Sequence, residues 1–363
     1  MRMICILWAL ALMLPAGPAQ AQRKGELTPC TTATASCTEW IAVAGDSSRL
    51  RVFRTYPLET RNSDITRAFI LVHGAGRDAD NYFRHALAAG FLGSALANTI
   101  IIAPRFASNN GGCRDTLVAG EWNWPCSGPA RWTSGGQATN SSTATSFDAA
   151  DALLRKLARK DKFPNLRAIV MAGHSAGGQF VSRYMMSNRL HEDLGIPITY
   201  LVANPSSYTY VDSLRPTVSA IPPNIAAAPP GYIAPLPQNP PAPFRAFSDA
   251  RGCTSYDAWP YGLRNRVGYA ARLSDEQLKQ QLATRKATYL LGELDILPLY
   301  GFDDSCAAMA QGLTRLARGF AFNAHVKQST GAQHEAIMVP ACGHNARCMF
   351  TADPVLRLIF ADR

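Results

Sequence analysis

A serine set between glycines, in the segment AGHSAGGQF at residues 172–180, is the feature best suited to chemistry. Gly173 and Gly177 stand two residues on either side of Ser175, directly after the apolar run AIVM. This pattern predicts a strand, a turn too sharp for larger side chains, and then a helix. Such a turn would hold the hydroxyl of Ser175 out of the fold, where it could act as a nucleophile.

A serine hydroxyl needs a base to take its proton, and the late histidines supply the candidates. We predict His344, because it follows the last apolar run and lies between Cys342 and Cys348, whose disulfide would limit its movement. His334 precedes that run, so we expect it on the surface at the opposite edge of the sheet. His325 lies earlier in the chain, and its position favours it less than His344 as the base.

The base in turn needs an acid to orient it, and we predict Asp295. Asp295 ends the run YLLGELD and begins a loop at the carboxyl edge of the sheet, where ligands gather. Glu293 competes with it but lies within the apolar run, and the pair Asp303 and Asp304 is typical of a helix cap. The chain order serine, acid, histidine is the order expected for a nucleophile on a strand–turn–helix elbow.

Backbone N–H groups must also stabilise the oxyanion that forms during such a reaction. Ala176, directly after the serine, is one predicted donor. The second is expected from the turn in LVHGAGRDADNYF, at Ala75, with Gly76 as a near competitor.

Gly76 and three further residues near this edge could contact a substrate. His174 adjoins the nucleophile and could line a pocket. Asn204 and Tyr208 follow an apolar run, and a capped turn explains them at least as well as substrate contact.

The elements that must position these residues alternate between strands and helices. Apolar runs predict strands at residues 68–74, 99–104, 166–173, 198–205, 287–295 and 335–342. Helices are predicted at residues 147–160, 177–186 and 304–319. Because the strand runs are apolar on both faces, we expect an α/β fold with a mostly parallel sheet covered by helices on both sides.

The N-terminus has the features of a secretory signal peptide at residues 1–21. Arg2 precedes an apolar run at residues 4–14, and the small-residue motif AQA follows at residues 19–21. The run is too short to span a bilayer, and no later segment is predicted to do so. We therefore expect a periplasmic or secreted chain, with residues 22–363 forming a single domain.

Eight cysteines remain after the signal peptide, an even number that predicts disulfides in an exported protein. Proximity in the sequence favours the pairs Cys30 with Cys37, Cys113 with Cys126 and Cys342 with Cys348, which leaves Cys253 with Cys306, although eight cysteines allow 105 pairings. The chain has no C-x-x-C pair, so we expect no structural zinc.

The charge composition limits the kinds of partner that we expect the chain to bind. The chain has 36 Lys and Arg residues against 26 Asp and Glu, a net charge of +10. These positive residues are scattered, which argues against nucleic-acid binding and leaves an anionic substrate as one option. Residues 205–260 hold 12 of the 24 prolines, so residues 206–262 are predicted to be an insertion or lid, with a solvated loop as the alternative.

The segments HGAGRDADNYF, AGHSAGGQF, ANPSSYTY, YDAWPYGL, GELD and ACGHNARCMF together resemble the α/β-hydrolase superfamily, over essentially the whole mature chain. They are most similar to a group of secreted or intracellular members from bacteria and fungi. The resemblance implies an α/β-hydrolase fold and a triad carried by Ser175, Asp295 and His344, and it implies no metal or organic cofactor. The turn His-Gly-Ala-Gly lacks the three-glycine run of hormone-sensitive-lipase-like esterases.

The leading hypothesis is an exported serine hydrolase that cleaves small or polymeric carboxylic esters through an acyl-serine intermediate. Hydrolysis of an amide, a peptide or another polymer by the same triad is the alternative. A binding module on the same fold without catalytic activity, with the proline-rich segment as its contact surface, is the alternative from another class.

Overall fold

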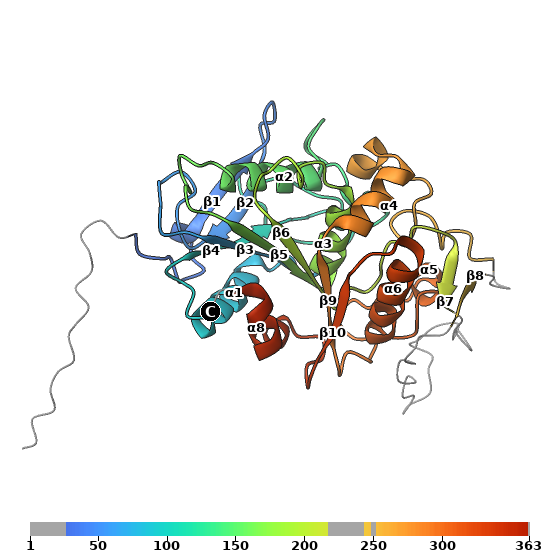
Figure 1. Cartoon of the computed structure of the whole chain (residues 1–363). Helices are drawn as coiled ribbons and strands as arrows, with labels where there is room; N and C mark the ends of the chain where they lie inside the picture. The colour runs from blue at the N-terminus through green and yellow to red at the C-terminus, as the bar shows by residue number, and fades with distance from the viewer. Residues whose placement is uncertain (1–26, 217–242, 248–251, 362–363) are drawn as a thin grey trace, which may run out of the picture.

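The chain folds around an eight-stranded sheet in the computed structural model, which describes residues 27–216, 243–247 and 252–361 (Figure 1). The strands lie in the order β1-β2-β4-β3-β5-β6-β9-β10. β2 is antiparallel to both of its neighbours, and the remaining pairs are parallel. The strands are β1 (Thr38–Ala42), β2 (Arg49–Arg54), β3 (Arg67–Val72), β4 (Thr99–Arg105), β5 (Ala168–His174), β6 (Ile198–Ala203), β9 (Ala287–Gly292) and β10 (Glu335–Val339).

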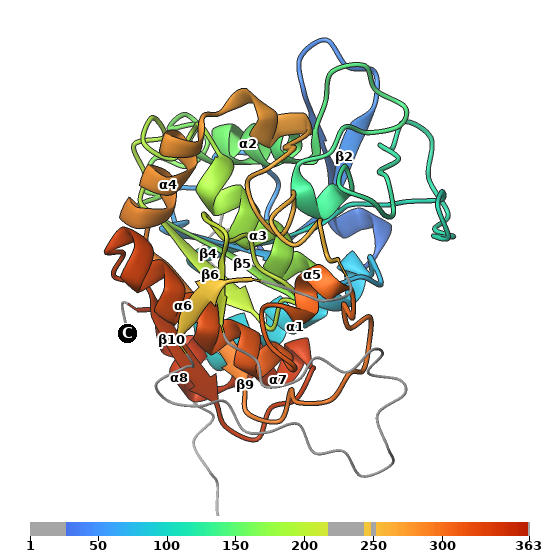
Figure 2. The same cartoon turned by 90° about the vertical axis from the view of Figure 1, so that its right-hand side faces the viewer.

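Helices cover both faces of the sheet (Figures 1 and 2). One apolar core contains side chains of α2 (Ser146–Leu157), α3 (Ala176–Ser187), α4 (Asp275–Thr284) and α6 (Arg315–Thr330). A second core, on the other face, contains side chains of α1 (Ala79–Leu92), α7 (Ala346–Thr351) and α8 (Asp353–Ile359). Successive side chains of a strand point to opposite faces, so Ile70 of β3 enters the first core and Phe69 enters the second. This arrangement confirms the predicted α/β class.

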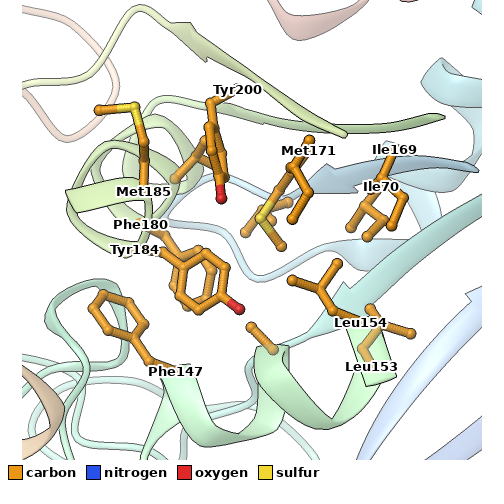
Figure 3. Close-up of a cluster of buried hydrophobic side chains, with 14 of the residues drawn as sticks. Ile70, Phe147, Leu153, Leu154, Ile169, Met171, Phe180, Tyr184, Met185 and Tyr200 are labelled. Carbon is orange, nitrogen blue, oxygen red and sulfur yellow. The ribbon is translucent and has the colours of Figure 1, made fainter. Parts of the chain in front are cut away.

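The first core anchors α3, the helix that begins directly after Ser175 (Figure 3). The ring of Phe147 on α2 packs edge-on against Phe180 and Tyr184 of α3, with ring centroids 5.1 and 5.3 Å apart. The Tyr184 hydroxyl donates a 2.6 Å hydrogen bond to Asp151 of α2. The strands contribute Ile70, Ile169, Met171 and Tyr200 to the same cluster. Packing of large side chains therefore fixes α3 on the sheet.

The six predicted strands and two of the three predicted helices are present. The third predicted helix, at residues 304–319, is wrong, because the chain forms α5 (Cys306–Met309) and then α6. Gly312 has φ +140°, a conformation that ends a helix, and the hydroxyl of Thr314 caps α6 by accepting from the N–H of Ala317 at 3.0 Å. The sequence also did not predict β1, β2, α1 or α4.

Parts of the predicted N-terminal and proline-rich features lie outside the described residues. The expected signal peptide at residues 1–21 is one of these, as are residues 217–242 and 248–251 of the expected insertion or lid. On either side of residues 217–242, β7 (Leu214–Pro216) pairs antiparallel with β8 (Phe244–Ala246). The buried guanidinium of Arg215 donates to the carbonyls of Tyr256 and Tyr261, at 2.7 and 3.3 Å.

Four disulfides join the eight cysteines of the described residues. They are the three pairs favoured by sequence proximity, Cys30–Cys37, Cys113–Cys126 and Cys342–Cys348, and the pair that these leave, Cys253–Cys306. Disulfides persist in oxidising compartments, so they indicate folding outside the cytosol. Within the described part of the chain, every helix is too short or too polar to cross a membrane.

Replacing both Cys253 and Cys306 with serine is expected to lower the free energy of unfolding by roughly 4 kcal/mol, because this disulfide closes a loop with a sequence separation of 53. The matched change at Cys342 and Cys348, with a separation of 6, is expected to lower it by roughly 2 kcal/mol. Urea unfolding of the two double variants measures both values. A larger loss for the shorter loop would contradict this expectation.

Candidate active site

Ser175 lies at the turn between β5 and α3, in a backbone conformation that side chains rarely adopt. Its φ is 58° and its ψ is −120°. Such a conformation raises the energy by about 1–3 kcal/mol and persists only when the surroundings impose it. The N–H of Ser175 donates to the carbonyl of Ala203, at the end of β6, at 2.9 Å.

Three glycines let the neighbouring backbones approach this turn. A Cβ at Gly173 would lie 2.1 Å from the carbonyl oxygen of Gly177, and a Cβ at Gly177 would lie 2.2 Å from that of Val72. At Gly178 it would lie 2.6 Å from the carbonyl oxygen of Ala203. Because each obstacle is backbone, no rotamer change could relieve the clash. The glycines around Ser175 are therefore required by the packing of β3, β5, β6 and α3.

His344 and Asp295 meet at the ends of β10 and β9. Nδ1 of His344 lies 2.7 Å from Oδ2 of Asp295, and the two side chains are 6% and 2% exposed. A carboxylate can only accept a hydrogen bond, so Nδ1 carries the proton and donates it. In the neutral ring Nε2 then has a free lone pair, which is the state that a general base needs.

Asn204 fixes the loop that contains His344 to the end of β9. Its Oδ1 accepts from the N–H of Gly292 at 2.8 Å, and its Nδ2 donates to the carbonyl of Gly343 at 3.2 Å. Gly292 ends β9 and Gly343 immediately precedes His344. The side chain of Asn204 is buried and both ends of its amide are bonded, so the structure gives it a positioning role in place of the substrate contact considered above.

Arg315 is a charged neighbour of Asp295. The sequence did not indicate this contact, because Arg315 lay inside the helix that was wrongly predicted at residues 304–319. Its side chain is fully buried and Nη1 donates to Oδ1 of Asp295 at 3.3 Å. Nη2 donates to the carbonyls of Leu299 and Tyr300 at 2.7 and 3.1 Å, and Nε donates to the hydroxyl of Ser206 at 3.0 Å. Burial lowers the pKa of Arg315, and the charge of Asp295 opposes that shift. The two oxygens of Asp295 thus have different partners, an imidazole and a guanidinium.

The turn after β3 lies beside Ser175. A Cβ at Gly74 would be 3.5 Å from Cβ of Ser175, and Ala75 and Gly76 next to it are exposed. On the other side of the serine, Ala176 is the first residue of α3, and the first N–H groups of a helix have no partner within it. The predicted oxyanion donors therefore lie on segments that flank the hydroxyl.

His73 fixes this turn from within the protein. Its Nε2 accepts from the N–H of Phe106 at 2.9 Å, so its proton is on Nδ1, which donates to the carbonyl of Gly74 at 2.9 Å. Burial lowers the pKa of His73 from 6.5 to about 4. The ring is therefore neutral near pH 7, in one tautomer.

His174 lies against the candidate base. The ring centroids of His174 and His344 are 4.5 Å apart, and Nδ1 of His174 lies 3.0 Å from the hydroxyl of Tyr82. Burial, together with the nearby His344, lowers the pKa of His174 well below its usual value. The structure thus links His344 directly to Asp295 and, through the ring of His174, to the segment that carries Ser175.

Tyr208 does not reach this edge. It is fully buried, its ring stacks on Phe322 with centroids 4.5 Å apart, and its backbone bonds to the amide of Gln311. The substrate contact considered for it is therefore replaced by a role in the core.

The rejected histidines are also paired elsewhere. His334 is buried between the hydroxyl of Tyr289 and the carbonyl of Arg285, at 2.8 and 2.9 Å, so the expectation that it is exposed was wrong. Its ring nitrogens satisfy groups that burial would otherwise leave unbonded. His325, on α6, lies 2.9 Å from a carboxylate oxygen of Asp212.

The competing carboxylates have structural partners. Glu293 accepts from the N–H of Ala341 at 2.8 Å, and Asp303 accepts from the hydroxyl of Tyr261 at 2.8 Å. Within the described ranges, no cluster of three or more His, Cys, Asp or Glu residues could hold a metal ion.

Comparisons with known proteins fit this architecture. The sequence model described as "Alpha/beta hydrolase family" matches residues 69–359. No curated protein sequence matches the chain significantly. Among solved structures, a poly(3-hydroxybutyrate) depolymerase from Bordetella parapertussis is similar, with a TM-score of 0.55, 20% identity, and coverage of 87% of this chain and 85% of the other. Poly(aspartic acid) hydrolase-1 from Sphingomonas sp. KT-1 has a TM-score of 0.54 and 20% identity, with 89% and 98% covered. At this identity the two likenesses show the fold.

The buried His73 predicts a loss of stability in acid. Its folded pKa of about 4 is below the usual 6.5, so the unfolded chain binds the proton first and stability falls as the pH drops from 6.5 toward 4. This residue accounts for a loss of roughly 3 kcal/mol across that interval. Urea unfolding of the protein and of His73→Gln from pH 7.5 to 4.5 measures it. The variant should show the shallower dependence on pH, and equal slopes would contradict the assignment.

Proposed function

The chain belongs to the alpha/beta hydrolase family, and from that premise we propose that it is an exported serine hydrolase of carboxylic esters. The observation that carries the proposal is the buried hydrogen bond from His344 to Asp295, at the edge of the sheet where the strained turn presents Ser175. In this proposal Ser175 is the nucleophile, His344 the base and Asp295 the acid, and the N–H groups of Ala176 and Ala75 are the oxyanion donors, which together are the groups that acyl transfer needs.

The proposed reaction has two halves. Oγ of Ser175 attacks the ester carbonyl while Nε2 of His344 takes its proton, and the carboxylate of Asp295 stabilises the imidazolium that forms. The N–H groups of Ala176 and Ala75 bind the oxyanion. His344 then gives the proton to the leaving alcohol, and the acyl-serine remains. A water molecule attacks this ester in the same way, which releases the acid and restores Ser175 and His344.

Export is part of the proposal. Its supports are the four disulfides and the expected signal peptide. The two similar structures carry names that refer to polymers, a polyester in one case and a polyamide in the other. Polymer hydrolysis by the same triad is therefore the second candidate function.

Replacing Ser175 with alanine tests the nucleophile. The change is expected to abolish labelling by a fluorophosphonate probe and to lower kcat for p-nitrophenyl acetate by about 10⁴-fold or more, because the proposed acyl intermediate forms on the hydroxyl of Ser175. Ser94→Ala is the matched control, since Ser94 is an exposed serine that also has a positive φ, of 47°. The control should label and turn over normally.

Labelling that persists in Ser175→Ala would contradict the proposed nucleophile. Absence of both labelling and turnover in the unaltered protein would instead favour the binding module.

Arg315 is expected to influence the pH below which kcat/KM falls. In Arg315→Met the carboxylate of Asp295 no longer shares its charge with a guanidinium, so it stabilises the imidazolium of His344 more strongly. The acidic limb of kcat/KM for p-nitrophenyl acetate should therefore move to higher pH, and Arg315→Lys should restore part of the original profile. A pH titration of initial rates measures the shift.

Arg318→Met is the matched control for the Arg315 variants. Arg318 is also buried on α6, but it donates to the carbonyls of Gly312, Asp303 and Ser206 and has no hydrogen bond to Asp295. Its loss should lower the melting temperature and leave the acidic limb in place. An unchanged limb in Arg315→Met would contradict the role given to Arg315.

A further inference from the structure

The segment at residues 294–300, around Asp295, exposes large apolar side chains beside the candidate site. Leu294, Leu297, Leu299 and Tyr300 have 48% to 74% of their surface exposed. They are four of the eight large hydrophobic residues that are exposed in the described part of the chain, and they fall within seven consecutive positions. Single exposed apolar residues are normal, but a group of them on one segment is typical of a binding surface. We call these four residues the apolar shelf.

The shelf adjoins the proposed catalytic groups on two sides. The ring of Tyr300 lies nearly parallel to the ring of His344, with an interplanar angle of 11° and centroids 6.3 Å apart. At the next residue, a Cβ on Gly301 would lie 3.8 Å from Cβ of Ala75. The shelf therefore extends from the candidate base to the turn with the candidate oxyanion donor. A substrate bound at Ser175 between these groups has the shelf as its neighbour.

The backbone of the shelf is held in place while its side chains face solvent. Arg315 donates to the carbonyls of Leu299 and Tyr300, at 2.7 and 3.1 Å. The N–H of Leu294 donates to the carbonyl of Cys342 at 2.9 Å. The side chain of Ile296 is instead partly buried and packs against the first core. A surface fixed in this way loses little conformational entropy when a ligand binds.

The chemistry of the shelf selects the ligand. The run ILPLYGF at residues 296–302 has no charged side chain, and Asp295 before it is buried. A charged or strongly hydrated polymer would lose water there without gaining a partner. The shelf is an open surface, whereas a single acyl chain is best bound in an enclosed pocket. An extended, uncharged aliphatic chain fits both properties.

We propose that the apolar shelf binds an aliphatic polyester chain and places one of its ester groups at Ser175. This inference rests on the proposed function and names the substrate class of the same site. Methylene and methyl groups of the polymer lie on Leu297, Leu299 and Tyr300, and the adjacent carbonyl enters between the turn with Ala75 and the ring of His344.

The test compares two double variants, each of which replaces two exposed apolar side chains. Leu297→Ser with Leu299→Ser removes apolar groups from the shelf without changing Tyr300, which lies beside His344. Phe91→Ser with Met338→Ser removes side chains that are 73% and 46% exposed, on α1 and β10. Hydrolysis of polycaprolactone particles, p-nitrophenyl dodecanoate and p-nitrophenyl acetate is measured for each protein. Adsorption to the particles is measured with Ser175→Ala added to each.

The shelf variant is expected to lose about tenfold in the ratio of polyester to acetate hydrolysis, and about tenfold in adsorption, as two weakened apolar contacts predict. The control should keep both values within twofold. Equal losses in the two variants, no loss in either, or a loss with the dodecanoate but not the polyester would overturn the proposal. Hydrolysis of poly(aspartic acid) without any of the polyester would also overturn it.

The adsorption measurement separates the two proposals from each other. Absence of all ester hydrolysis in the unaltered protein would count against the proposed function. Adsorption that still depends on Leu297 and Leu299 in that case would keep the shelf as a polyester-binding surface, and adsorption independent of them would overturn it.

Discussion

The close approach of four backbone segments around Ser175 is the constraint on which the rest of the site depends. Gly173 and Gly177 leave room for the carbonyls that their neighbours place there, and the serine between them is forced to a φ of 58°. The strain is sustained because α3 is packed against the sheet by large buried side chains, as Figure 3 shows. Stability in the core thus maintains a turn that would not form by itself.

A second level of organisation brings Asp295 and His344, the candidate acid and base, together. The parallel strands β9 and β10 end at the same edge of the sheet, so the residues that follow them are neighbours in space. The amide of Asn204 then joins the end of β9 to the loop with His344, and the disulfide Cys342–Cys348 closes that loop. Arg315 binds both the acid and the segment with the apolar shelf. One buried guanidinium therefore connects the proposed chemistry to the proposed substrate surface.

The sequence predicted features that are encoded locally. Glycine spacing predicted the turn at Ser175, and apolar runs predicted that Asp295 and His344 follow strands. It did not predict what depends on contacts between distant segments. Arg315 looked like one basic residue within a long helix, because neither the break at Gly312 nor the approach of Asp295 is visible in a local pattern. His334 was expected on the surface, but Tyr289 and the carbonyl of Arg285 satisfy both of its nitrogens inside the fold. The role of Asn204 could not be predicted, because the same amide group can join two buried backbone segments or contact a ligand.

In the proposed reaction Ser175, His344 and Asp295 act on one bound carbonyl as a unit. A crystal structure of the protein after reaction with an alkyl phosphonate ester tests it most directly, since the tetrahedral phosphorus imitates the intermediate of acyl transfer. The proposed triad requires phosphorus bonded to Oγ of Ser175, Nε2 of His344 about 3 Å from an oxygen on that phosphorus, and a phosphonyl oxygen about 3 Å from the N–H groups of Ala176 and Ala75. Phosphorus on another residue, or an imidazole of His344 directed away from the adduct, would contradict it.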